Sequence, residues 1–127
     1  MDSNEFVVGD KYELLALHRG LLEARFCDRE NDADVSGSPI LAKLHRRLIS
    51  VLVSLDKPVG GSKSQWAAWL QMDEGRREWN VAIDRARRFI GWGGLDFEAK
   101  RAAALDFLSP FEVESELVDL SIACVEK

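Results

Sequence analysis

All four tryptophans of this chain lie between residues 66 and 92, and their spacing limits what the segment can fold into. Trp66 and Trp69 recur at helical spacing with Leu70. At roughly 100° per residue, Trp79 would lie about 220° around the same straight helix from Trp66, nearly on its opposite side. One continuous helix would therefore leave one set of tryptophans in water. We predict a helix break near residue 73, with Asp73 as the N-cap of the second helix.

The first half of the chain has two further helical segments. Apolar residues recur at helical spacing from Asp10 to about Cys27, and Asp10 and Glu13 have the spacing of a capping box. Ser38 and Pro39 have the character of an N-cap and a first helical residue, so a second helix is predicted to begin there. Its apolar residues cover more than one face, which predicts that it is the most buried helix.

Breaker and capping residues set the predicted boundaries between the later helices. The cluster at 57–61 ends the second helix, and Ser62 has capping-box spacing to Gln65. The glycines of 91–94 end the tryptophan segment, and Asp96 is the predicted cap of the next helix.

The strongest local start signal in the chain is at residues 109–112. Ser109 is the predicted N-cap, Pro110 the first helical residue and Glu112 the capping-box partner. The last helix is therefore predicted to begin at Pro110 and to run close to the C-terminus.

These segments predict an all-α fold, a single-domain bundle of five to six helices with short loops. The domain is predicted to span residues 1–127, with 1–9 as an N-terminal tail. With 127 residues, 46% of them hydrophobic, the chain can bury a core of ordinary size. No apolar run approaches the roughly 20 residues that a membrane span needs, and the acidic N-terminus does not resemble a signal peptide. We therefore predict a cytoplasmic protein without a membrane partner.

Charge is unevenly distributed along the chain. Residues 1–36 carry nine acidic and four basic residues, residues 37–92 five and ten, and residues 93–127 eight and three. We expect the acidic ends to fold over the basic middle and neutralise it. The alternative is that the basic middle meets a partner.

Residues with catalytic or metal-binding chemistry are sparse. The two histidines have no metal-type partners at helical spacing; His18, on an apolar helix face, is predicted to be buried, and His45, in a basic cluster, to be solvated. The acidic loop at 28–37 matches only the first half of a calcium-binding loop and places Lys43 where a bidentate glutamate is needed. No nucleophile elbow, P-loop or dinucleotide motif occurs. We predict no catalytic residue, no metal and no cofactor, and we incline against an enzyme.

The remaining candidates are binding residues in the tryptophan segment, namely Arg76, Arg77, Arg85 and Trp92. Aromatic residues and arginine dominate the energetics of protein interfaces. Arg85 has no acidic residue three or four positions away, so it is the most available of the arginines. If Arg85 and Trp92 anchor a partner, both should be exposed in the free protein.

The sequence thus favours a non-catalytic protein-binding module, such as an inhibitor, an immunity protein or an adaptor, that acts by steric occlusion of another protein. One alternative is a nucleic-acid-binding protein that uses the basic residues of 43–92. A second alternative is a small-molecule-binding helical bundle in which the tryptophans line a cavity. The wide apolar arc of the C-terminal helix also suggests a homodimer through that helix.

Overall fold

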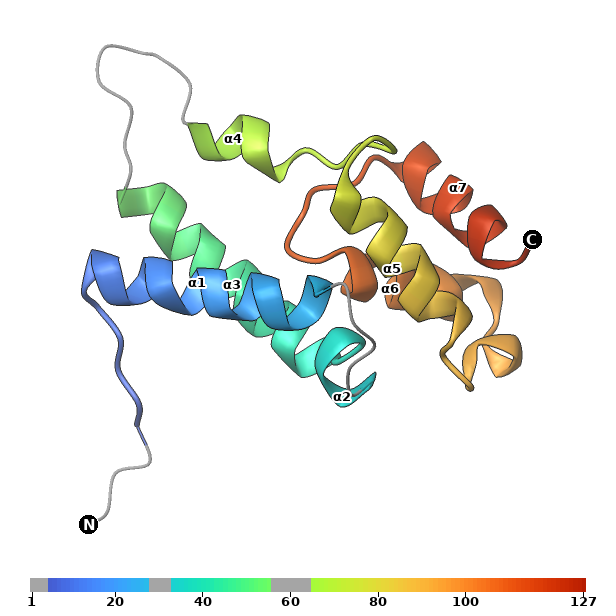
Figure 1. Ribbon diagram of the computed structural model, residues 1–127, viewed down its shortest axis with the longest axis horizontal. Helices are drawn as coiled ribbons and strands as arrows, with labels where there is room; N and C mark the ends of the chain where they lie inside the picture. The colour runs from blue at the N-terminus through green and yellow to red at the C-terminus, as the bar shows by residue number, and fades with distance from the viewer. Residues whose placement is uncertain (1–4, 28–32, 56–64) are drawn as a thin grey trace.

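The computed structural model describes residues 5–27, 33–55 and 65–127, and these residues form helices without a strand (Figure 1). In chain order the elements are α1 (Lys11–Phe26), α2 (Ala33–Ser36), α3 (Pro39–Leu55), α4 (Gln65–Leu70), α5 (Arg77–Arg87), the 3-10 helix η1 (Trp92–Gly94), α6 (Phe97–Leu108) and α7 (Ser115–Val125). The predicted all-α bundle is therefore confirmed. Every helix in this part of the chain falls short of what crossing a membrane requires. The predicted breaker cluster at 57–61, the predicted cap Ser62 and the first half of the acidic loop lie outside the described residues.

The helices form two groups, each around its own buried core. α1 and α3 cross with α4 beside them, whereas α5, α6 and α7 pack together at the other end of the molecule (Figure 1). The first core consists of Leu14, Leu48, Ile49, Leu52 and Leu70. The second and larger core includes Phe26, Trp79, Phe107, Phe111 and Val118. Trp69 packs against both cores and so lies at the junction of the two groups.

Side-chain caps fix the start of three helices where the sequence predicts them. The Asp10 carboxylate accepts hydrogen bonds from two N–H groups of the first turn of α1. The Ser38 hydroxyl accepts from the Leu41 N–H at 3.1 Å, and the Asp96 carboxylate accepts from the Ala99 N–H at 2.8 Å. These bonds satisfy N–H groups that have no partner within the helix.

The predicted helix break near residue 73 is confirmed, because α4 ends at Leu70 and α5 begins at Arg77. The predicted cap is wrong. Arg76 occupies the cap position, and the Asp73 carboxylate instead accepts from the Gly75 N–H at 2.7 Å within the connecting turn. The break allows Trp79 to face the larger core, where it is buried.

The predicted helix start at Ser109 is wrong, since α7 begins only at Ser115. The Ser109 hydroxyl and the Glu112 backbone, which a cap would have used, form tertiary hydrogen bonds instead. The Ser109 hydroxyl donates to the Ala42 carbonyl of α3 at 2.8 Å. The backbone of Glu112 pairs with the segment after α4, donating to the Leu70 carbonyl at 2.7 Å and accepting from the Met72 N–H at 3.0 Å. A local capping signal is worth only about 1 kcal/mol, which such contacts outweigh.

The apolar side chains of α7 pack against the core of their own chain. Val118, Ile122 and Val125 are buried, and Leu117 and Leu120 are half-buried against the same core. None of the large apolar residues of α7 is exposed. A homodimer through this helix stays a prediction, but it has no apolar face on which to form.

Candidate ligand-binding site

Trp92 is a core residue and not an exposed anchor. Its side chain is 7% exposed, and its indole N–H donates to a carboxylate oxygen of Glu126 at 3.2 Å. The ammonium group of Lys100 lies 5.9 Å from the centroid of the Trp92 ring. The expectation that Trp92 is exposed is therefore wrong, because η1 turns the ring inward against the larger core.

Arg77 and Arg85 lie beside the C-terminal end of α1. Arg85 is only 7% exposed and donates to the Cys27 carbonyl at 2.7 Å, so the expectation that it is exposed is also wrong. Arg77 is exposed, and its guanidinium donates to the Phe26 carbonyl at 2.5 Å. The physical reason is that the last carbonyls of a helix lack partners within it and carry the negative end of its dipole.

Arg76 joins α4 to the larger core. Its guanidinium donates to the Trp69 carbonyl near the end of α4 and lies 4.7 Å from the centroid of the Phe111 ring. It also lies 3.7 Å from a carboxylate oxygen of Glu78. The four predicted binding residues are thus not gathered on one open surface, and each makes contacts within the chain.

Other arginines of the basic middle also bind helix-end carbonyls. Arg46 donates to the Leu105 carbonyl near the end of α6 at 2.9 Å, and Arg87 donates to the Cys124 carbonyl near the end of α7 at 2.6 Å. Arg46 also lies 3.4 Å from the Asp106 carboxylate, which joins the basic middle to the acidic C-terminal part. Among the described residues, this ion pair joins the basic middle to an acidic end, whereas the other arginines named here bind uncharged backbone carbonyls.

A concave site with a volume of about 500 Å³ lies between α1, α3 and α4. We call it the tryptophan cavity. Its apolar lining comes from Leu15, Leu22 and Leu52, its aromatic lining from Trp66 and Trp69, and its polar lining from Lys11, His18, Arg19 and Gln65. The rings of Trp66 and Trp69 meet edge to face with centroids 5.5 Å apart, so together they form an angled aromatic wall.

His18, which lines this cavity, forms a buried pair with His45 where α1 crosses α3. His18 Nδ1 and His45 Nε2 are 2.9 Å apart and share one hydrogen bond. His18 is buried as predicted, with its ring centroid 5.0 Å from that of Trp69. His45 is fully buried, so the prediction that it is solvated is wrong. Its position in a basic stretch is misleading, because position 45 is on the side of α3 that faces α1.

The surroundings of His45 decide which nitrogen of His18 carries the proton. His45 Nδ1 is buried and has no hydrogen-bond partner among the described residues. An unpaired buried N–H is less tolerable than an unpaired lone pair, so His45 carries its proton on Nε2 and donates it to His18 Nδ1. The proton of His18 then lies on its other nitrogen, Nε2, and the His18 side chain lines the cavity. The lining of the cavity thus includes an N–H donor.

Both histidines are neutral at neutral pH. Burial lowers the pKa of His45 to about 3, with smaller contributions from His18 and Arg25. Burial also lowers the pKa of His18, and the nearby charge of Arg19 acts in the same direction. His18 therefore acts in the cavity as a neutral hydrogen-bond donor and not as a cation.

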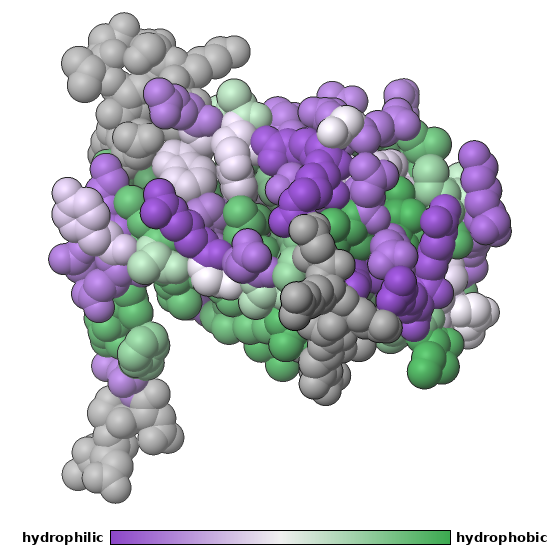
Figure 2. Space-filling view, in the orientation of Figure 1, coloured by the Kyte–Doolittle hydropathy of each residue, from purple (hydrophilic) through white to green (hydrophobic). Residues whose placement is uncertain are grey.

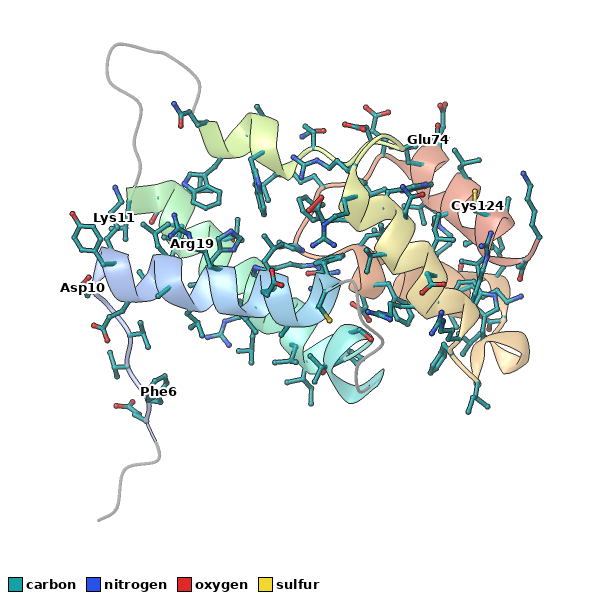
Figure 3. All side chains as sticks on the ribbon, in the orientation of Figure 1. Phe6, Asp10, Lys11, Arg19, Glu74 and Cys124 are labelled. Carbon is teal, nitrogen blue, oxygen red and sulfur yellow. The ribbon has the colours of Figure 1, made fainter. Side chains whose placement is uncertain are left out.

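Positive charge at the cavity comes from Lys11 and Arg19, both exposed. Figure 3 shows the two residues on the side of α1 that faces α4. Neither forms an ion pair with another described residue. The cavity therefore combines an aromatic wall, a neutral donor in its lining and two cations at its edge.

Comparison with protein families, with curated proteins and with solved structures found no match. The fold and the site therefore define the protein only as an all-α bundle whose tryptophan cavity lies over a buried histidine pair.

One sequence signal could have revealed this site. Lys11, Leu15, His18 and Leu22 recur with intervals of four, three and four residues, which is one stripe of a helix. A lysine and a histidine on an otherwise apolar stripe indicate a boundary between core and solvent. His45 carried no such signal, because its burial depends on where α1 crosses α3.

Proposed function

We propose that this chain binds a small organic anion with a flat apolar part in the tryptophan cavity. This proposal develops the small-molecule alternative of the sequence analysis. The observation that carries it is the buried His18 ring in the lining of a cavity walled by Trp66 and Trp69, where the tautomer inferred above places an N–H donor on Nε2.

The form of the cavity supports a small ligand. Its volume of about 500 Å³ falls within the range of about 300–1,000 Å³ in which small-molecule sites occur. A flat ring can pack against the indoles of Trp66 and Trp69, and aromatic pairs add about 0.5–1.5 kcal/mol beyond the area that they bury. An apolar lining with a few convergent polar groups is the usual composition of such sites.

The charges around the cavity support an anion. Lys11 and Arg19 supply positive charge, and the lining contains no acidic residue. A carboxylate accepts hydrogen bonds from a neutral imidazole N–H and from ammonium or guanidinium groups, whereas a cation would meet only donors.

Protein binding through Arg85 and Trp92, the function that the sequence favoured, loses its main support because both side chains are buried. Nucleic-acid binding is weakened by the same contacts, since Arg76, Arg77 and Arg85 each donate to a backbone carbonyl. Both functions remain proposals, with less support than ligand binding in the tryptophan cavity.

Isothermal titration with naphthoate and with its neutral analogue naphthamide tests the proposal. We expect naphthoate to bind more tightly. Replacing His18 with phenylalanine keeps a ring but removes the donor, and it should weaken naphthoate binding by about tenfold or more. Replacing Arg19 with glutamine should weaken it by a factor of about 2–5, as expected for an exposed charge.

Arg88→Gln is the matched control, because it also removes an exposed arginine charge but does so just after the end of α5, away from the cavity. It should leave naphthoate binding unchanged. Equal affinity for naphthoate and naphthamide, or equal loss in Arg19→Gln and Arg88→Gln, would contradict the proposed preference for an anion.

A further inference from the structure

The α1–α3 pair has an exposed apolar face on the side away from α4. We call it the α1–α3 face and define it by four residues that are each nearly half exposed: Leu17 43%, Leu44 44%, Val51 45% and Leu55 49%. At roughly 100° per residue, the three residues of α3 lie within about 40° of one another. Figure 2 shows hydrophobic side chains along the lower edge of the molecule, below α1. Contiguous apolar surface of this kind is typical of interaction sites.

Helical phase places the apolar residue of α1 and the apolar residues of α3 on the same side of the α1–α3 pair. α4 covers the side of α3 that carries Ile49 and Val53, and it faces the side of α1 that carries Arg19. On α3, Leu44 and Val51 lie opposite the side that carries Ile49 and Val53. On α1, Leu17 lies opposite the side that carries Arg19. The four apolar residues therefore share one face that no other described helix of the chain covers.

Gly20 lies on α1 at this face, in the middle of the helix. A Cβ atom there would meet nothing within 4 Å, so no contact inside the chain requires glycine. Glycine in a helix interior is destabilising relative to alanine. Ala16 and Ala24, one turn to either side, are also small and exposed. The three residues form a shallow strip that another helix can approach closely.

The charged residues at the face are complementary between the two helices. Glu13 lies on α1 within the face, beside Leu17, and Glu23 lies further round the exposed side of α1, whereas Lys43 and Arg47 lie on the exposed side of α3 away from α1. None of the four forms an ion pair within the described part of the chain. If α1 of one copy lies on α3 of another, the acidic edge of each copy meets the basic edge of the other. Placing α1 on α1 would instead bring like charges together.

The N-terminal segment adds apolar surface beside the same face. Phe6 is 87% exposed and Val7 is 80% exposed, and Phe6 and Leu17 line one shallow depression. Figure 3 shows Phe6 well below Asp10, so the segment runs beside the face with its apolar side chains exposed. An apolar arm in this position can pack on a second molecule.

We propose that a second copy of this chain covers the α1–α3 face in a two-fold symmetric dimer. α1 of each copy lies on α3 of the other, and residues 5–9 of each copy pack against the other. A two-fold contact of this kind uses the same patch twice, which requires that the patch be self-complementary. The acidic and basic edges of the α1–α3 face meet that requirement. The dimer is independent of the ligand proposed for the tryptophan cavity.

Sedimentation velocity of the full chain over a wide range of concentration tests the dimer. We expect the wild-type protein to sediment as a dimer that dissociates on dilution. Gly20→Arg should sediment as a monomer at every concentration. Because the new side chain meets nothing in the monomer, this variant should be no less resistant to urea than the wild-type monomer. A wild-type chain that stays monomeric throughout, or a Gly20→Arg dimer, would overturn the proposal; the first result would leave the face to a different protein.

Charge reversal tests the arrangement of the helices. Glu13→Lys with Glu23→Lys should give a monomer, and so should Lys43→Glu with Arg47→Glu. An equimolar mixture of the two double variants should form a mixed dimer, since each acidic edge then faces a basic edge. Glu74→Lys is the control, an exposed charge on the opposite side of the molecule (Figure 3), and it should remain a dimer. A mixture that stays monomeric would overturn the pairing of α1 with α3.

Discussion

Replacing Arg25 with methionine will lower the free energy of unfolding by roughly 2–5 kcal/mol. Arg25 is 1% exposed, and its guanidinium donates to the carbonyls of Asp106 and Ser109 at the end of α6. Methionine fills much of the same volume, but it removes the donor of both carbonyls. The Asp106 carbonyl still accepts from the Ser109 N–H at 3.3 Å, whereas the Ser109 carbonyl loses its donor. Each unsatisfied buried group costs about 1–3 kcal/mol, and part of this loss is offset because a buried charge is also removed.

Burial lowers the pKa of Arg25 to about 10, with a further lowering by Arg46 and an opposing contribution from Asp106. The guanidinium therefore stays charged at neutral pH, and the effect of Arg25→Met should be the same from pH 6 to pH 8. Urea denaturation, extrapolated to water, measures it. Arg46→Met is the matched control, because the exposed Arg46 side chain also donates to a carbonyl near the end of α6. The free energy of unfolding of Arg46→Met should fall by no more than about 1 kcal/mol. Equal losses in the two variants would contradict a structural role for the buried guanidinium.

The free energy of unfolding will fall as the pH is lowered below about 6.5, because of the histidine pair. His45 has a pKa of about 3 in the folded chain, far below its ordinary value, and the pKa of His18 is also lowered. The unfolded chain therefore binds protons at pH 6 that the folded chain does not bind. The free energy of unfolding is therefore highest above the pKa of the histidines in the unfolded chain. It falls as the pH is lowered towards their pKa in the folded chain. The slope approaches about 1.4 kcal/mol per pH unit for His45, and His18 adds to it in the same direction.

The informative range is from about pH 6.5 to pH 5, above the ordinary pKa values of the carboxylates. Urea denaturation at several pH values in this range measures the slope. His45→Phe should be less stable than the wild type at pH 7.5, but its stability should depend less on pH. An unchanged slope in His45→Phe would show that the pH dependence arises elsewhere in the chain.

The boundaries of the helices could be predicted from the sequence wherever the signal is local. Asp10, Ser38 and Asp96 cap helices as predicted, since a cap involves only residues two or three positions away. The break between α4 and α5 followed from the phase of the tryptophans. The start predicted at Ser109 failed because its hydroxyl binds the Ala42 carbonyl, 67 residues away in sequence.

The candidate site could be predicted only in part, because its chemistry depends on contacts between distant segments. The possibility that tryptophans line a cavity could be stated from the sequence, but Trp66 and Trp69 could not be chosen over Trp79. His45 appeared solvated among basic neighbours until α1 was placed across it. Arg85 appeared available because no acidic residue lies nearby in sequence, yet its partner is a backbone carbonyl at the end of α1. Charge patterns in a sequence do not reveal such partners.

The most direct test of ligand binding in the tryptophan cavity is a titration of the protein with naphthoate, followed through the indole N–H signals in a two-dimensional nitrogen–proton NMR spectrum. Trp66 and Trp69 line the cavity, whereas Trp79 and Trp92 are buried in the other core. We predict that saturating naphthoate shifts the signals of Trp66 and Trp69 and leaves those of Trp79 and Trp92 in place. Signals of Trp66 and Trp69 that do not move at saturation, or equal shifts of all four indoles, would contradict a ligand site at this cavity.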